Sequence, residues 1–391
     1  MRRSARGAEP DKNTMKKPQL FTPGPTPLPP ETLLAMAQPI DYHRSPASAT
    51  LIADVLTKLK HVFQTENDVL CLTTSGTGAM EGAVANLLSR GDKVLVIRSG
   101  KFGERWSDIC TAYGVEVIPI DVTWGESVSP STVEARLDAS PDVKAVFATL
   151  CETSTGALHD IAALAQPTQL RPTLLVVDAV SALGADDLQM DAWGVDAVVS
   201  CSQKGLMTPP GLAFAALNAR AWDAAARSDL PKYYLDFQKA RDAGREGSTP
   251  YTPAITLLHA LQASLTLLCA EGIRNAIARH ARLAQATRSA VAALGLQLFA
   301  THPANTLTSI RLPAEVDGKA FIALMREKHG ITYAGGQSQL SGKIFRIAHL
   351  GWMNENDVIV AIAALERGLA EIGYEMPLGA GVAAAQEVFR R

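Results

Sequence analysis

Three short stretches of the sequence carry residues whose types could act together in chemistry. Lys204 lies among small residues in SCSQKG (200–205), and a lysine in a tight, partly desolvated space has a lowered pKa and a nucleophilic amine. Asp178 ends the apolar run TLLVVD, where a carboxylate commonly faces the ligand crevice of an open α/β sheet. The stretch TTSGTGAMEGA (73–83) joins an apolar run to an amphipathic one, which predicts backbone N–H groups facing an anion.

Together the three stretches match what pyridoxal phosphate requires of a protein. The turn at 75–77 would hold the phosphate, Lys204 would form a Schiff base, and Asp178 would keep the pyridine nitrogen protonated. Each stretch alone has a plainer interpretation, namely a structural turn, a helix cap or a surface lysine. The glycines at 76, 78 and 82 miss the dinucleotide-binding spacing, and the next apolar run, KVLVIR, ends without an acidic residue.

The elements that must position these residues follow from apolar runs alternating with amphipathic stretches. The helical pattern at 79–90 is one such stretch, and the alternation predicts a mainly parallel sheet with helices on both faces. Most runs are continuous rather than alternating, as in strands buried on both faces. The predicted strands are 69–73, 94–98, 145–149, 173–177, 197–200 and 212–217.

A change of pattern after residue 253 predicts a second, smaller α+β domain. We expect two helices within 254–294, broken near Glu271-Gly272, then a strand (306–312), a helix (318–329), a strand (343–349) and a helix (354–372). The predicted division is a flexible extension at 1–18, a large cofactor-binding domain with an N-terminal arm at 19–255, and a linking helix with the small domain at 256–391. The polar run KARDAGREG (239–247) is predicted to be a solvated loop.

Composition narrows the class of protein. The chain has 391 residues, a formal net charge of −2 and no apolar run near the roughly 20 residues of a membrane span. No basic excess indicates nucleic acid, and five cysteines without a C-x-x-C pair favour a reducing compartment over a metal cluster. The basic, polar start lacks the apolar segment of a secretory signal. We expect a cytoplasmic protein without membrane span, nucleic-acid partner or metal.

Strand alternation singles out one arginine in KIFRIAHL (343–350). It places Ile344, Arg346, Ala348 and Leu350 on one face of a strand, and a buried arginine on that face needs an anion. That anion is either a bound ligand or the partner in a structural ion pair.

The sequence resembles the class V pyridoxal-phosphate-dependent aminotransferases of the alanine–glyoxylate and serine–pyruvate type, which have fold type I. The resemblance extends from about residue 22 to 372, and its most specific parts are the Asp-Ala-Val-Ser and Ser-Gln-Lys stretches. The stretches that carry it are TPGPTPLPP, TTSGTGAMEGAVANLL, GKFGERW, ETSTGAL, VVDAVSALG, SCSQKGLMTPPGL, TPYTPAITLLHALQASL and FRIAHLGW.

The resemblance implies roles around the cofactor in addition to those of Lys204 and Asp178. Phe102 stands where many relatives carry a stacking Trp, and it keeps the aromatic face but lacks the indole N–H. Trp106, one helical turn later, is the weaker candidate for stacking. The other implied contacts are the phosphate with Ser75, Gly76, Thr77 and Gln203, the neighbouring subunit's phosphate with Thr252, the phenolic oxygen with Thr153, and the underside of the ring with Val180.

On the substrate side, the resemblance implies that Arg346 clamps the substrate carboxylate and that Gly24 lies beside the substrate. The implied activity moves an amino group from a small L-amino acid (alanine, serine or aspartate) to a 2-oxo acid (glyoxylate or pyruvate), in a homodimer with shared active sites. Only Arg44, Arg241 and Arg245 are candidates for binding a second carboxylate. The alternatives are a lyase of the cysteine desulfurase kind and a non-catalytic cofactor-binding subunit.

Overall fold

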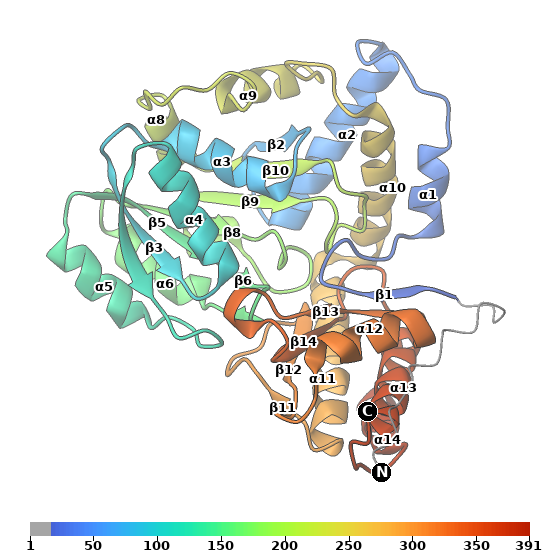
Figure 1. Cartoon of the computed structure of the whole chain (residues 1–391). Helices are drawn as coiled ribbons and strands as arrows, with labels where there is room; N and C mark the ends of the chain where they lie inside the picture. Colours follow the sequence, from blue (N-terminus) through green and yellow to red (C-terminus); the bar gives the residue numbers. More distant parts are fainter. Residues whose placement is uncertain (1–16) are drawn as a thin grey trace.

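The computed structural model describes residues 17–391, and nearly all of the extension predicted at 1–18 lies outside these residues. The chain forms two β-sheets with helices packed on them, and a two-stranded ribbon of β6 (Cys151–Glu152) and β7 (Ala157–Leu158). Figure 1 shows the larger sheet, built from the first two thirds of the chain, above the smaller one.

The larger sheet has seven strands and is mainly parallel, as the sequence predicts. Only β10 runs antiparallel to its two neighbours. The central strands are short apolar runs with every residue buried, because helices cover both faces. The strands, in spatial order, are β2 (Val69–Leu72), β10 (Ala213–Leu217), β9 (Ala197–Cys201), β8 (Leu174–Asp178), β5 (Val143–Thr149), β3 (Lys93–Arg98) and β4 (Glu116–Asp121).

Two hydrophobic cores lie on the two faces of this sheet. One contains side chains of α2 (Pro46–Phe63), α5 (Pro130–Ala139), α6 (Ile161–Gln169) and α10 (Ile255–Glu271). The other contains side chains of α3 (Gly76–Leu87), α4 (Lys101–Ala112), α8 (Ala219–Ala225) and α9 (Phe237–Arg245). The short helices α1 (Pro30–Met36) and α7 (Met190–Trp193) complete this part of the chain.

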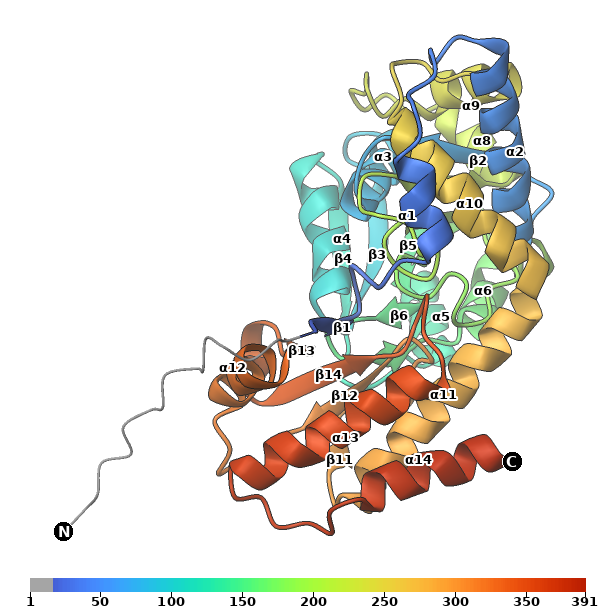
Figure 2. The ribbon, with the colours of Figure 1, turned by 90° about the vertical axis from the view of Figure 1, so that its right-hand side faces the viewer.

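The smaller sheet belongs to the C-terminal third and is joined by the first strand of the chain. Figure 2 shows its helices stacked against it: α11 (Ile273–Ala293), α12 (Gly318–His329), α13 (Glu355–Glu371) and α14 (Ala380–Arg390). A 3-10 turn, η1, spans Ser338–Leu340. The strands, in order, are β1 (Gln19–Phe21), β13 (Ile331–Gly335), β14 (Ile344–Ala348), β12 (Leu307–Arg311) and β11 (Gln297–Leu298).

The predicted break near Glu271-Gly272 is confirmed, because α10 and α11 meet there with an 85° bend. No single helix within residues 17–391 is long and apolar enough to cross a membrane, although this bent pair passes the same test by length and composition. The division of the chain into domains at residue 255 stays a prediction.

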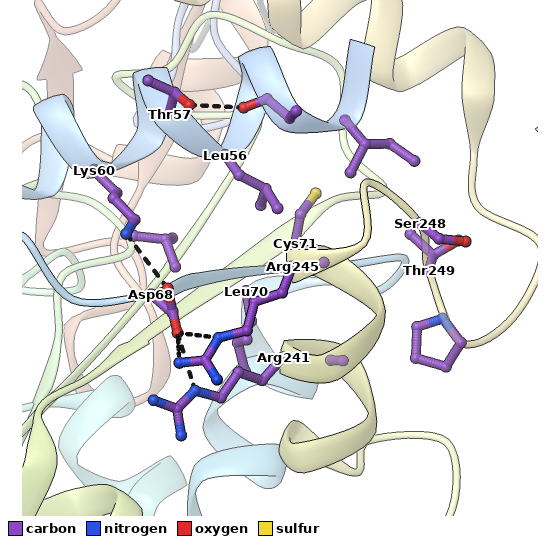
Figure 3. A pocket seen from close by; sticks show the side chains of 16 residues that line it. Leu56, Thr57, Lys60, Asp68, Leu70, Cys71, Arg241, Arg245, Ser248 and Thr249 are labelled. Atoms are coloured by element: carbon purple, nitrogen blue, oxygen red, sulfur yellow. Dashed lines mark hydrogen bonds and ion pairs between the residues drawn. The ribbon is translucent and has the colours of Figure 1, made fainter. Parts of the chain in front are cut away.

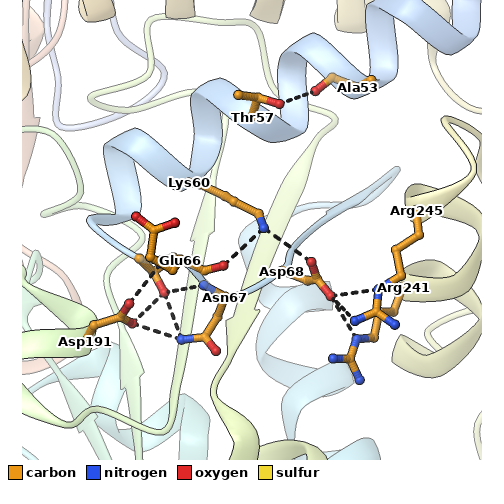
Figure 4. A network of polar contacts seen from close by, with 10 residues as sticks. Ala53, Thr57, Lys60, Glu66, Asn67, Asp68, Asp191, Arg241 and Arg245 are labelled. Carbon is orange, nitrogen blue, oxygen red and sulfur yellow. Dashed lines mark hydrogen bonds and ion pairs between the residues drawn. The ribbon is translucent and has the colours of Figure 1, made fainter.

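The prediction of a solvated loop at 239–247 is wrong. Helix α9 covers most of it, with Phe237 and Ala240 buried against β2 and α3. Arg241 and Arg245 both donate to Asp68 Oδ2, at 2.9 Å and 2.7 Å, and Lys60 lies 3.3 Å from Asp68 Oδ1. Figures 3 and 4 show these cations converging on one carboxylate beside a pocket between α2, β2 and α9. The polar pattern of the run is that of a helix with one buried face.

Candidate active site

The three predicted stretches meet at one edge of the larger sheet. Asp178 is the last residue of β8, Lys204 follows β9 by three residues, and Ser75 follows β2 and precedes α3. Strands β8 and β9 are parallel, and β2 and β9 run in the same direction because both are antiparallel to β10. Their carboxyl ends therefore open on the same edge, where ligands of such sheets bind.

Lys204 is buried at this edge, and among the described residues its amine contacts one hydroxyl group rather than a carboxylate. Nζ donates to Ser181 Oγ at 3.2 Å, and Ser181 Oγ lies 2.5 Å from Thr153 Oγ1. Burial lowers the pKa of Lys204 from its ordinary value, which favours the uncharged, nucleophilic amine. Gly24 lies against this side chain, since a Cβ on it would stand 2.4 Å from Lys204 Cε.

Asp178 has few polar contacts for a buried carboxylate. Its Oδ1 accepts a hydrogen bond from the N–H of Val180 at 2.7 Å. Its pKa is raised to about 7, chiefly by burial and also by the nearby Glu152 carboxylate, although the hydrogen bond from Val180 and the charges of Lys204 and Arg105 act to lower it. A carboxylate in this condition is stabilised by a cationic group brought against it.

The turn before α3 fits an anion. Ser75 is the residue before the helix, its side chain caps nothing, and the N–H groups of Gly76 and Thr77 begin the helix. Val180 borders the turn, because a Cβ on Gly76 would come within 2.8 Å of Val180 Cγ2. The amide oxygen of Gln203 is buried, and no residue in the described part of the chain hydrogen-bonds to it.

Phe102 lies on the first turn of α4 with its ring partly exposed. The guanidinium of Arg105 stands 4.8 Å from the centre of this ring, and Arg105 Nη1 donates to Thr77 Oγ1 at 3.0 Å. Trp106 is fully buried in the core, and its ring centre lies 4.7 Å from that of Phe147. Of the two aromatic residues, Phe102 is therefore the one free to stack on a ligand.

Arg346 comes from β14 of the smaller sheet and is buried without an ion pair among the residues the structure describes. Nε and Nη2 donate to the carbonyl of Gly335 at 3.1 Å and 2.7 Å, and Nη1 donates to the carbonyl of Thr153 at 2.7 Å. Burial lowers its pKa to about 10. A guanidinium has five N–H donors, so one on Nη1 and one on Nη2 remain for an anion. Within residues 17–391, no carboxylate lies within ion-pair distance of this guanidinium, which favours the substrate carboxylate over a structural ion pair.

The remaining predicted residues make no hydrogen bond or ion pair with Lys204 or Asp178 in the described part of the chain. Thr252 is exposed, and within the described part of the chain its hydroxyl has no hydrogen-bond partner. Of the candidates for a second carboxylate, Arg241 and Arg245 are held by Asp68, and Arg44 is exposed. No group of three or more His, Cys, Asp or Glu side chains within residues 17–391 is placed to hold a metal ion.

Sequence reasoning missed Ser181 and Arg105. Ser181 directly follows Val180 and lies three residues after Asp178, so its position next to these predicted site residues could have indicated that it belongs to the site. Arg105 lies one helical turn after Phe102 in GKFGERW, which predicts that both face the same way on a helix. No spacing rule predicts the contact of Arg105 with Thr77, because the two residues lie on different helices.

Comparisons with known proteins agree with this geometry. A family model described as aminotransferase class-V matches residues 20–351. A protein named soluble hydrogenase, small subunit, from Synechococcus sp. is 43% identical, over 95% of this chain and 98% of its own length. The L-aspartate–glyoxylate aminotransferase of Paracoccus denitrificans is 38% identical, over 95% of this chain and 96% of its own. The crystal structure of an alanine–glyoxylate aminotransferase from Nostoc sp. has a TM-score of 0.88 at 32% identity, over 93% of this chain and 98% of that one.

Proposed function

Because this chain belongs to the class V aminotransferases and has their fold type I, we propose that it is a pyridoxal-phosphate-dependent transaminase whose chemistry depends on Lys204. The observation that carries the proposal is the buried Lys204 amine at the strand edge that also presents Asp178 and the turn before α3. The donor we propose is a small L-amino acid, and the acceptor is a 2-oxo acid, glyoxylate or pyruvate. Names of relatives support glyoxylate.

The residues present fit the cofactor. The amide oxygen of Gln203 is buried and has no partner among the described residues, and a flip of the amide would turn its NH₂ group toward an anion there. Ser75, Gly76 and Thr77 would hold the phosphate, with Arg105 supporting the Thr77 hydroxyl. The remaining contacts proposed for the ring and its phenolic oxygen belong to Phe102, Val180 and Thr153.

When bound, pyridoxal phosphate supplies an electron sink for a substrate carbanion. Asp178 would be ionised opposite a cationic ring nitrogen and would keep that nitrogen protonated. Arg346 binds the substrate carboxylate with its two free N–H groups, and Gly24 leaves room for the substrate beside Lys204. Lys204 Nζ takes the α-proton of the donor and returns a proton to the acceptor, while Ser181 orients the amine.

We also propose a homodimer in which Thr252 reaches the phosphate in the other subunit. Its exposed hydroxyl without an intramolecular partner supports this role. The proposed location is cytoplasmic, which the reducing compartment favoured by the cysteine content supports. Size-exclusion chromatography at working concentration tests the assembly.

The test of the function uses the purified protein loaded with pyridoxal phosphate. We expect borohydride reduction to fix the cofactor on Lys204, visible by peptide mass spectrometry, and Lys204→Ala to lose both the label and turnover. A panel of alanine, serine and aspartate, read by bleaching of the visible band, identifies the donor. A Lys204→Ala protein that keeps wild-type turnover would refute the proposal.

Two relatives carry the names of hydrogenase subunits, which favours the second candidate function, a cofactor-binding subunit of a larger complex. Such a chain would be yellow and labelled at Lys204, but no amino donor would bleach it. The same panel therefore separates the two functions.

A further inference from the structure

Helix α4, which carries Phe102 and Arg105, is preceded by a residue that cannot cap it. The residue before the helix is Gly100, and it has no side chain to accept hydrogen bonds from the first N–H groups of the helix. Those groups belong to Lys101, Phe102 and Gly103. Buried N–H groups without partners would cost the helix much of its stability. Their acceptors must come from elsewhere in the chain.

The acceptors are two side chains about fifty residues later in the sequence. Glu152 Oε2 accepts from the N–H groups of Phe102 and Gly103, both at 3.0 Å, and Ser154 Oγ accepts from the N–H of Lys101 at 3.0 Å. Glu152 Oε1 accepts from the N–H of Ser154 at 3.1 Å and from its hydroxyl at 2.5 Å. All three leading N–H groups are therefore capped by the segment 152–154.

Glu152 is fully buried, and no cation lies within ion-pair distance of it among the described residues. Burial raises the pKa of Glu152, whereas the positive end of the α4 dipole, the four hydrogen bonds and the nearby charge of Arg346 favour the ionised carboxylate. The absence of a side chain at Gly100 makes this approach possible, because a Cβ there would lie 2.5 Å from Glu152 Cδ and 2.4 Å from Ser154 Oγ.

The same segment contacts the other parts of the proposed site through Thr153. Its hydroxyl lies 2.5 Å from Ser181 Oγ, which accepts the hydrogen bond from Lys204 Nζ. Its carbonyl accepts a hydrogen bond from Arg346 Nη1 at 2.7 Å. Three consecutive residues therefore fix the start of α4, the amine of Lys204 and the guanidinium of Arg346 relative to one another.

We propose that Glu152 is a positioning residue, which holds the first turn of α4 so that the Phe102 ring lies at a fixed place relative to Lys204 and Arg346. The proposal rests on the proposed function, since Phe102 is positioned for the cofactor ring. Glu152 touches neither the substrate nor the reacting atoms, and it acts through the backbone of Phe102 and through Thr153.

The experiment compares Glu152→Gln with a matched control elsewhere in the chain. Glu366 is also buried and caps α14 in the same way: Oε2 accepts from the N–H of Gly379 at 2.7 Å, and Oε1 accepts from those of Gly381 and Val382 at 2.8 Å and 3.0 Å. In either glutamate both oxygens accept N–H groups. A glutamine at either place therefore turns its NH₂ toward a donor whichever way the amide points.

In the apoprotein, hydrogen exchange reports each cap without reference to the cofactor. We expect Glu152→Gln to lower the protection of the Phe102 and Gly103 amides by about tenfold or more, and Glu366→Gln to do the same at Gly381 and Val382. In the loaded protein, only Glu152→Gln should raise the dissociation constant of pyridoxal phosphate, by about tenfold, and weaken the visible circular dichroism of the bound cofactor.

Several outcomes would overturn the proposal. If Glu152→Gln loses amide protection but binds the cofactor as the wild type does, the cap is structural only. If Glu366→Gln weakens the cofactor equally, the effect is one of general stability. If Glu152→Gln does not fold, Ser154→Ala removes one capping hydrogen bond instead. It should lower amide protection and cofactor affinity in the same direction but by less. Unchanged amide exchange and unchanged affinity in this variant would overturn the proposal. A wild type that fails to bind pyridoxal phosphate would overturn the proposed function, while the amide exchange would still report the cap.

Discussion

Replacement of Arg346 by glutamine tests how the chain binds the carboxylate of its substrate. The guanidinium is buried, and three of its five N–H donors are used by the carbonyls of Gly335 and Thr153. The two that remain belong to different terminal nitrogens, which is the fork that binds a carboxylate with two parallel hydrogen bonds. Glutamine fills similar space but offers one NH₂ group and no charge.

The expected loss of kcat/KM follows from the burial of the ion pair between Arg346 and the substrate carboxylate. Truncating one partner of a buried, hydrogen-bonded charge pair costs about 2 to 5 kcal/mol. With about 3 kcal/mol, kcat/KM should fall roughly 150-fold, because each 1.36 kcal/mol corresponds to about a factor of ten. Most of the loss should appear as a higher KM, since the carboxylate is held alike in ground state and transition state. Arg346→Lys keeps a positive charge but not the two parallel donors, so its kcat/KM should lie between those of the wild type and Arg346→Gln.

The assay is steady-state kinetics with the best donor of the panel, and the chain offers a matched control. Arg220 also donates to two backbone carbonyls, those of Arg171 and Thr173, both at 2.8 Å, but it lies at the other end of β8 from Asp178. We expect Arg220→Gln to keep kcat/KM within about threefold. If Arg346→Gln keeps the wild-type value, or if both variants lose it alike, the assignment of Arg346 is refuted.

Two further predictions concern Asp186 and Gly24. Burial raises the pKa of Asp186 from 3.8 to about 7, so between these pH values the folded apoprotein holds a proton that the unfolded chain has released. The free energy of unfolding therefore falls as the pH rises from about 4 to about 7, by on the order of 4 kcal/mol. Asp186→Asn should therefore reduce the loss of melting temperature that accompanies a rise from pH 5 to pH 8, and an unchanged profile would contradict this. Gly24 has a φ of +144°, and a Cβ on it would clash with the side chain of Lys204. We therefore expect Gly24→Ala to lower turnover at least tenfold and to slow borohydride labelling of Lys204. Wild-type rates would show instead that the Lys204 side chain can move aside.

The meeting of Lys204, Asp178 and the turn at 75–77 could be predicted because each follows a strand of one sheet. Once the strands are parallel, their carboxyl ends share an edge, and no knowledge of the intervening chain is needed. The face of Arg346 was predictable for a similar reason, since alternation along β14 places Phe345 and Ile347 in the core of the smaller sheet, and Ala348 and Leu350 in that of the larger one.

What escaped prediction depends on contacts between distant segments. The helix at 237–245 was missed because the run is mostly polar, although its residues follow the pattern of a helix that buries one face, that of Phe237 and Ala240. The hydroxyl that meets Lys204 belongs to Ser181, and the cap on α4 comes from Glu152, about fifty residues from the helix it caps. Spacing along the chain gives no information on such contacts, because they are set by how the loops at the sheet edge fold over one another.

The charges near the site bear on which donor is used. A donor with a second carboxylate needs a second free cation, and Arg241 and Arg245 are both bound to Asp68 beside a different pocket. Arg105 lies over Phe102 and against Thr77, on the side proposed for the phosphate. Each of these three arginines already contacts another group, so none of them is free to bind a second carboxylate. This favours a donor with a small, uncharged side chain. A clear preference for aspartate would contradict this argument, and it would require a cation brought from elsewhere, for which the exposed Arg44 is available.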